Sequence, residues 1–170
     1  MSVAEVIDAA LRDAELTYER ADPDSFVVNL PGTRRLKTAC WLRIGEHAVS
    51  IEAFVVRKPD ENAEQVYRYL LEHNARMYAV AWSIDDSGDV YLTGRVPLAS
   101  ITAEEVDRIL GAVLEYADGS FNALLQLGFG SSIRREWAWR VKNNESLANL
   151  AAFEEFAKRT VDTSAKRTSD

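Results

Sequence analysis

The sequence predicts an α+β fold in which helices pack on an antiparallel sheet of about five strands, in the order α-β-β-β-α-β-β-α, followed by a C-terminal helical extension. Helix starts support this order, because a short side-chain acceptor three residues before a Glu or Gln opens each apolar-periodic run. These pairs are Ser2 with Glu5, Asn62 with Gln65, and Thr102 with Glu105. Extended stretches fill the intervals between the helix starts, and turn sequences join most of them as hairpins.

The first helix is expected to lie against the core, because its apolar residues recur at steps of three and four positions and share one face. They are Val3, Val6, Ile7, Ala10, Leu11 and Ala14. Short extended stretches at 17–20 and 26–30 follow this helix. A turn around Pro23 separates them, so that they can count as one interrupted strand.

Two hairpins are expected further along the chain. Stretches 36–44 and 48–56 flank the turn sequence Gly45-Glu46-His47, and stretches 77–84 and 90–96 flank a loop rich in Asp and Gly. The residues on the better core face of 48–56 are Val49, Ile51, Ala53 and Val55. Between the hairpins, Pro59 ends the strand and a helix is expected from Asn62 to about Asn74.

The third helix begins after Thr102 and is expected to end or kink at Gly119, with apolar content continuing as far as Gly128. We expect Gly128 and Gly130 to form a C-cap and linker, which places the domain boundary there. Residues 1–129 then form the α+β domain, 130–160 a Trp/Arg segment with a short helix, and 161–170 a disordered tail. The apolar residues in register in the short helix are Leu147, Leu150, Phe153 and Ala157.

Composition narrows the class of protein. A chain of 170 residues, of which 47% are apolar, can bury one core. Its N-terminus does not resemble a signal peptide, and no apolar run reaches the length of a membrane-spanning helix, so we expect a cytoplasmic protein without membrane contact. Cys40, the single cysteine, lies in an expected strand and is interpreted as a small buried apolar group.

Sites of chemistry are not recognisable in the sequence. His47 and His73 are not spaced as metal ligands, and the acids of 85–89 have the wrong spacing for a calcium loop and fit a solvated turn. No Gly-x-Ser-x-Gly elbow is present. We therefore expect no metal, no cofactor and no catalysis, although folding could still bring two carboxylates together.

One basic and aromatic segment, 133–142, is the candidate binding site. Its candidate residues are Arg134, Arg135, Trp137, Trp139, Arg140 and Lys142. Aromatic rings between cations are typical of nucleic-acid binding, whereas the structural interpretation is that alternating Ile133, Trp137 and Trp139 bury against the sheet or a second subunit. The net charge of -7 opposes binding to phosphates, so packing is favoured and the segment is interpreted as a partner-binding arm.

The order of elements resembles the YbjN-like bacterial family, whose members adopt the fold of type III secretion chaperones. The matching features are the first amphipathic helix, the ribbon 36–56, the Pro59 break, the helix 66–74, the hairpin 77–98 with its Asp86-Ser-Gly88 turn, and the helix 102–117. The resemblance covers residues 2–125 and implies an antiparallel sheet covered by helices, often in a dimer. It also implies a sensory-transduction regulator or chaperone-like binding protein, and it implies no active site.

Together these features predict a non-catalytic protein-binding module with an unidentified protein partner, assembled as a homodimer. A nucleic-acid-associated regulator that uses segment 134–142 is one alternative. An enzyme with an unrecognised carboxylate site is the other.

Overall fold

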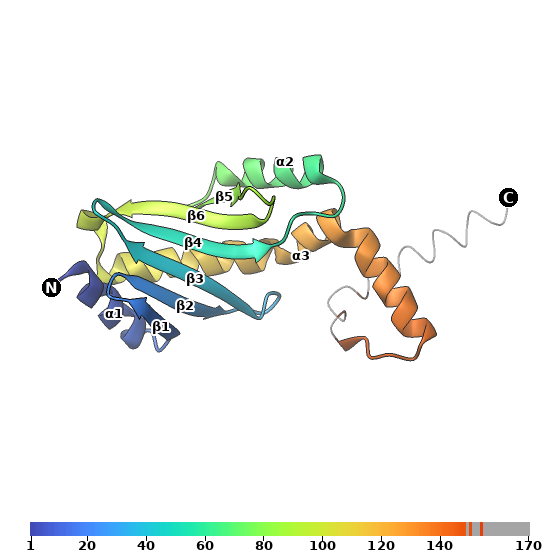
Figure 1. The fold of residues 1–170 in the computed structure, drawn as a ribbon, viewed down its shortest axis with the longest axis horizontal. Coiled ribbons are helices and arrows are strands. Elements are labelled where there is room, and N and C mark those ends of the chain that lie inside the picture. Colours follow the sequence, from blue (N-terminus) through green and yellow to red (C-terminus); the bar gives the residue numbers. More distant parts are fainter. Residues whose placement is uncertain (149, 151–153, 155–170) are drawn as a thin grey trace.

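A computed structural model describes residues 1–148, 150 and 154 of the chain. The described part contains a six-stranded antiparallel sheet in the order β1-β2-β3-β4-β6-β5 (Figure 1). The elements are α1 Val3–Asp13, β1 Thr17–Asp22, β2 Ser25–Pro31, β3 Lys37–Ile44, β4 Ala48–Val56, α2 Ala63–Asn74, β5 Ala81–Ile84, β6 Val90–Pro97, a 3-10 turn Leu98–Ser100, and α3 Ala103–Lys142. The predicted α+β class is therefore confirmed.

The sheet has one strand more than predicted. Stretches 17–20 and 26–30 are not one interrupted strand, because β1 and β2 pair with each other as a hairpin, with Arg20 opposite Phe26. In the second predicted hairpin, β5 begins at Ala81 and not at Met77. Ala79 has a φ of 63°, a left-handed conformation that a strand does not accommodate, so the extended run starts only after it.

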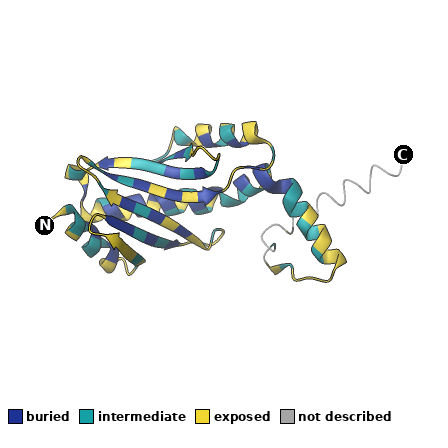
Figure 2. Cartoon of the chain, viewed as in Figure 1, coloured by how far each residue is buried: buried dark blue, intermediate teal, exposed yellow. Residues whose placement is uncertain are grey.

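One face of the sheet is covered by α3, and α1 and α2 lie beside α3 near opposite edges of the sheet (Figure 1). The predicted core face of β4 is confirmed, because Val49, Ile51, Ala53 and Val55 are all buried. Figure 2 shows the resulting alternation of buried and exposed residues along the strands. The core therefore lies between the sheet and α3.

Two of the three predicted helix caps form. Ser2 and Glu5 make the complete capping box, and the Thr102 hydroxyl accepts a hydrogen bond from Glu105 N at 3.1 Å. The cap predicted at Asn62 is wrong, because this residue is left-handed with a φ of 52° and its side chain does not cap α2. Its Nδ2 donates instead to the carbonyl oxygen of Leu127 at 3.0 Å, which ties the start of α2 to α3.

The predicted end of the third helix is also wrong, because α3 continues through Gly119 and Gly128 as far as Lys142. Gly128 is buried, and a Cβ there would lie 3.1 Å from Cβ of Pro59, so the glycine allows close approach of the β4–α2 loop. Its carbonyl oxygen accepts hydrogen bonds from the backbone N–H groups of Asp60 and Glu61. The distal part of α3 extends beyond the sheet and changes direction (Figure 1).

Two smaller predictions are confirmed. Cys40 is fully buried, and this burial raises the pKa of its thiol to about 12. In the β5–β6 loop, Asp85 Oδ1 accepts hydrogen bonds from the backbone N–H groups of Ser87 and Asp89, and Gly88 has a φ of 86°. Phe153 and Ala157 of the predicted short helix, and the whole of the predicted tail 161–170, lie outside the described residues.

Candidate functional site

The sheet forks between β3 and β4. Pairing between these two strands ends at Cys40 and Ala53. Beyond this point β3 stays paired with β2 as far as Lys37, and β4 stays paired with β6 as far as Val56. The two halves of the sheet therefore separate, and the gap between them opens toward α3.

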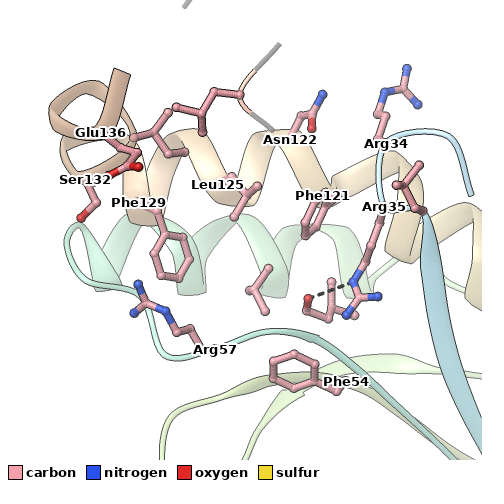
Figure 3. Close-up of a pocket in the computed structure, with 15 residues that line it drawn as sticks. Arg34, Arg35, Phe54, Arg57, Phe121, Asn122, Leu125, Phe129, Ser132 and Glu136 are labelled. Atoms are coloured by element: carbon pink, nitrogen blue, oxygen red, sulfur yellow. Dashed lines mark hydrogen bonds between the residues drawn. The ribbon is translucent and has the colours of Figure 1, made fainter. Parts of the chain in front are cut away.

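A groove with a volume of about 920 Å³ occupies this fork (Figure 3). We call it the forked groove. Its lining residues come from the β2–β3 loop, the end of β4, one side of α3 and the segment after α3. They are Arg34, Arg35, Leu36, Phe54, Val55, Val56, Arg57, Phe121, Asn122, Leu125, Phe129, Ser132, Ile133, Glu136 and Leu150.

Apolar side chains make up most of the groove. Leu36 is 78% exposed and Phe54 is 39% exposed, although both are large apolar residues. Phe121 and Leu125 of α3 are half-buried opposite them. Exposed apolar side chains gathered in a hollow are typical of a binding surface for another macromolecule.

The guanidinium group of Arg35 lies within this apolar surface. Its Nε donates to the carbonyl oxygen of Val55 at 3.1 Å, and its guanidinium lies 5.9 Å from the ring centre of Phe54 and 5.7 Å from that of Phe121. Burial lowers the pKa of Arg35. The side chain thus caps the part of the β4 edge that β3 leaves.

A single carboxylate holds the loop that carries Arg35. Asp118 Oδ1 on α3 accepts hydrogen bonds from the backbone N–H groups of Thr33, Arg34 and Arg35, at 2.9, 2.7 and 2.9 Å. Burial raises the pKa of Asp118, but these bonds outweigh it and hold the pKa below its usual value. A Cβ on Gly32 would clash with the backbone carbonyl oxygen of Arg35 and would lie 2.5 Å from the same Asp118 oxygen, so glycine is required there.

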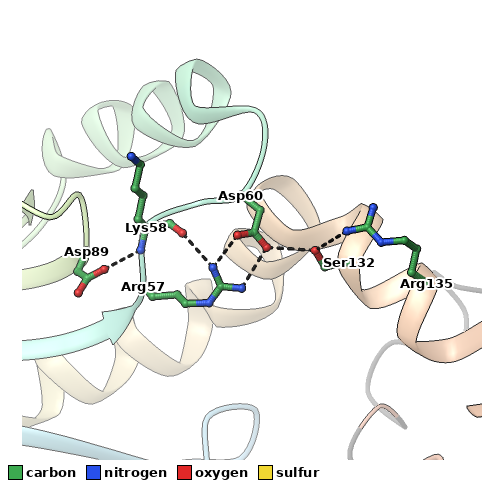
Figure 4. A network of polar contacts seen from close by, with 6 residues as sticks. All are labelled: Arg57, Lys58, Asp60, Asp89, Ser132 and Arg135. Carbon is green, nitrogen blue, oxygen red and sulfur yellow. Dashed lines mark hydrogen bonds and ion pairs between the residues drawn. The ribbon is translucent and has the colours of Figure 1, made fainter. Parts of the chain in front are cut away.

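A second polar network fixes the other end of the groove (Figure 4). Arg57 forms a bidentate ion pair with Asp60 at 2.6 and 3.0 Å, and its guanidinium lies 4.6 Å from the ring centre of Phe129. Asp60 also accepts a hydrogen bond from Ser132, which in turn accepts one from Arg135. These contacts tie the β4–α2 loop to the distal part of α3.

Glu61 strengthens the same connection. Its carboxylate accepts hydrogen bonds from Ser131 N at 2.7 Å and from Ser131 Oγ at 2.6 Å, and these bonds lower the pKa of Glu61. The distal half of α3 is therefore positioned by acids outside the helix.

One polar atom in the groove has no hydrogen-bond partner among the described residues. The side-chain oxygen of Asn122 is buried and accepts no hydrogen bond there. Buried acceptors in native proteins are nearly always satisfied.

The predicted binding segment 133–142 is helical. Successive residues of a helix are about 100° apart, so its aromatic and cationic residues spread around α3 and do not form one stripe. Within the single chain Trp139 is 54% exposed while Trp137 and Ile133 are half-buried, so the three side chains do not all pack against the sheet, and their burial against a second subunit stays a prediction.

The cations of this segment make local contacts. Arg140 pairs with Glu136 at 2.6 Å, Arg134 donates to Ser131 Oγ, and Arg135 donates to Ser132 Oγ. Lys142 is exposed. None of the six predicted residues lines the forked groove, although their neighbours Ser132, Ile133 and Glu136 do.

Most residues of the groove were not predicted from the sequence. Leu36 and Phe54 could have been found, because Phe54 lies on the face of its strand opposite the predicted core face and Leu36 directly follows a polar loop. Phe121 and Leu125 belong to the apolar run that continues as far as Gly128, and that run indicates packing alone. Their role depends on the fork in the sheet, and no local pattern predicts that fork.

Acidic side chains are scarce along the groove. Glu136 is the one carboxylate among its described lining residues. Throughout residues 1–148, 150 and 154, no group of three or more His, Cys, Asp and Glu side chains is placed to hold a metal ion. None of the helices in that same part of the chain combines the length and apolar character needed to cross a bilayer.

Three solved structures with a similar fold are of complexes between two proteins, one named a chaperone–effector complex and one from a type III secretion system. The structure of the ExsC–ExsE complex contains a chain with a TM-score of 0.55 at 20% identity, with 73% of this chain and 97% of that chain covered. The ExoU–SpcU heterodimer of Pseudomonas aeruginosa gives 0.51 at 16% identity, covering 73% and 98%. The HopA1–SchA chaperone–effector complex gives 0.51 at 14% identity, covering 68% and 89%.

Relatives in sequence come from mycobacteria. The uncharacterized protein Rv0487 of Mycobacterium tuberculosis is 52% identical over 157 residues, which cover 89% of this chain and 86% of that protein. The uncharacterized protein ML2442 of Mycobacterium leprae is 54% identical over 153 residues, covering 87% and 83%. The profile of the YbjN family, described as "Putative bacterial sensory transduction regulator", matches residues 4–126. The chain therefore belongs to the YbjN family and has the fold of the type III secretion chaperones.

Proposed function

We propose that this protein is a non-catalytic, chaperone-like module that binds an apolar segment of a partner protein in the forked groove. The observation that carries the proposal is the fork itself, which exposes Leu36 and Phe54 beside the apolar side of α3. The solved structures of similar fold are complexes of two proteins, one of them named a chaperone–effector complex, which supports a chaperone-like protein with a protein partner.

The groove suits an extended or helical segment better than a reacting small molecule. Its walls are apolar, its cations are Arg34, Arg35 and Arg57, and Asn122 offers a buried acceptor. Arg35 and Arg57 also lie over aromatic rings, so each presents a charge at the edge of an apolar surface. A partner with apolar side chains and nearby carboxylates matches this surface.

Binding to nucleic acid is less well supported. The net charge is -7, and the segment that could contact phosphates spreads its cations around a helix and pairs Arg140 with Glu136.

We further propose that the protein works in the cytoplasm as a homodimer. Light scattering at high micromolar concentration tests the dimer, and a monomer there would refute it.

Affinity capture with matched variants tests the proposed function. Leu36→Asp places a charge in the groove, while Leu71→Asp places one on α2, where Leu71 is 69% exposed and lies outside the groove lining. Because both side chains are exposed, neither change should alter folding. We expect the wild type and Leu71→Asp to retain the same specific protein from a native lysate and Leu36→Asp to lose it. Equal capture by all three proteins would contradict the groove as the binding site.

A further inference from the structure

The chain turns back on itself after α3. Asn144 has a φ of 52°, and the backbone N–H of Glu145 donates to the carbonyl oxygen of Arg140 at 2.8 Å. Arg140 Nη1 donates to the carbonyl oxygen of Ser146 at 2.9 Å, so the first residues after the turn are held against the end of the helix. The segment that follows is thereby directed away from the axis of α3.

This reversal brings Leu150 to the forked groove. Leu150 is half-buried and belongs to the groove lining together with Leu36, Phe54 and Leu125, which come from distant parts of the chain. The backbone N–H of Leu150 donates to the carbonyl oxygen of Leu147 at 2.9 Å, which places the two leucines one tight turn apart. An apolar side chain from beyond α3 is therefore already seated at the groove.

The sequence continues with residues that match the groove. Phe153 and Phe156 follow Leu147 and Leu150 at steps of three residues, and Glu154 and Glu155 stand between the two phenylalanines. The groove offers apolar walls and arginine side chains. Apolar side chains with adjacent carboxylates are complementary to such a surface.

We propose that residues 147–156, here called the return segment, occupy the forked groove of their own chain and that a partner must displace them. The inference rests on the proposed function, because it assumes that the partner uses this groove. It also names the partner's chemistry: a segment with apolar residues at short intervals and carboxylates beside them.

Peptide competition with the full chain tests the return segment. The probe is a fluorescein-labelled peptide with the sequence of residues 145–158, and the release variant is Leu150→Asp. A short tether gives an effective concentration of about 1 mM. If the Kd of the peptide is about 0.1 mM, the tethered segment occupies the wild-type groove most of the time. The probe then finds the groove free about tenfold less often in the wild type than in a variant whose segment is released. We expect Leu150→Asp to bind the probe about tenfold more tightly than the wild type, by fluorescence anisotropy.

Matched variants locate the probe. Adding Leu36→Asp to Leu150→Asp should abolish binding, whereas adding Leu71→Asp should leave it unchanged, and a scrambled peptide should not bind. Hydrogen exchange provides a second readout, because release should speed exchange in segments 54–57 and 121–133. Equal affinity of the wild type and Leu150→Asp for the probe, or no binding to either, would overturn the inference.

Two further outcomes are decisive. If Leu150→Asp converts a dimer into a monomer, the segment docks on a second copy, and the proposal of self-occupancy is wrong. A second outcome is that Leu36→Asp loses the partner in affinity capture while Leu150→Asp binds the probe no more tightly than the wild type. In that case the return segment does not occupy the groove, and the proposed function stands. If Leu36→Asp still binds both the partner and the probe, the proposed function and the return-segment proposal are both wrong.

Discussion

Replacing Asp118 by alanine should destabilise the protein and loosen one wall of the forked groove. The change removes the acceptor shared by the backbone N–H groups of Thr33, Arg34 and Arg35. Thr33 and Arg34 are exposed, so water can replace the carboxylate at those two donors. Arg35 is half-buried, and the Asp118 side chain is just 15% exposed, so the third bond is costly to lose.

The expected loss in free energy of unfolding is about 2–3 kcal/mol. A hydrogen bond to a charged group contributes about 1.5–3 kcal/mol, and we count one such bond in full plus a small part of the two rehydrated ones. Asp118→Asn keeps an acceptor oxygen and loses only the charge, so about 1 kcal/mol is expected. Both losses are a large fraction of the roughly 5–15 kcal/mol that stabilises a typical domain.

The stability contributed by the Asp118 carboxylate should depend on pH in a characteristic way. Because the folded-state pKa of Asp118 lies below its usual value, the carboxylate stabilises the fold above the usual pKa of about 3.9 and loses this contribution as pH falls through the lower folded-state pKa. The difference in stability between the wild type and Asp118→Asn should therefore be constant near neutral pH. It should shrink when the pH is brought below about 4.

Urea unfolding followed by tryptophan fluorescence measures these differences, because Trp82 is buried in the core and reports unfolding. Asp107→Ala is the matched control, since Asp107 is an exposed aspartate on the same helix. Gly32→Ala should also destabilise the protein, because its Cβ would clash with the backbone carbonyl of Arg35 and crowd the Asp118 carboxylate. If Asp118→Ala is no less stable than Asp107→Ala, the carboxylate does not hold the loop and the reasoning is wrong.

Two substitutions and one labelling experiment test other parts of the structure. Gly119→Ala should raise the free energy of unfolding by about 0.5–1 kcal/mol, because a Cβ there meets no atom within 4 Å and glycine weakens a helix interior. Urea titrations measure this difference. A loss of stability would mean that α3 needs flexibility at this position. Cys40 should resist a thiol reagent at pH 8 until urea unfolds the protein, since burial raises its pKa to about 12, and rapid labelling of the folded protein would contradict that burial. Glu61→Gln should speed amide exchange of residues 131–142 several-fold at pH 7, because the charged acceptor for Ser131 is lost. Since the pKa of Glu61 is lowered, this difference should fade as the solution is made acidic, and a difference that persists at low pH would argue against the ion as its cause.

The fold could be predicted in large part from local pattern. Alternation along β4 identified its core face, the Ser2 cap marked the start of α1, and Asp85 with Gly88 marked a turn. Each of these features depends on residues a few positions apart, so a short stretch of sequence contains the whole cause. The errors at Asn62 and Gly128 share another origin: the β4–α2 loop packs against α3, and this contact overrides the local preference.

The candidate site divides in the same way. Sequence alone revealed the class of fold, the absence of a recognisable catalytic motif and the position of a basic, aromatic segment near the end of the chain. The groove, however, joins residues 34–36, 54–57 and 121–136, and its existence depends on where β3 and β4 stop pairing. Strand register and the docking of a loop on a distant helix depend on contacts between segments that are remote in sequence. Such contacts produce no periodic pattern in either segment from which they could be predicted. The binding surface of this protein is therefore a property of its assembled layers.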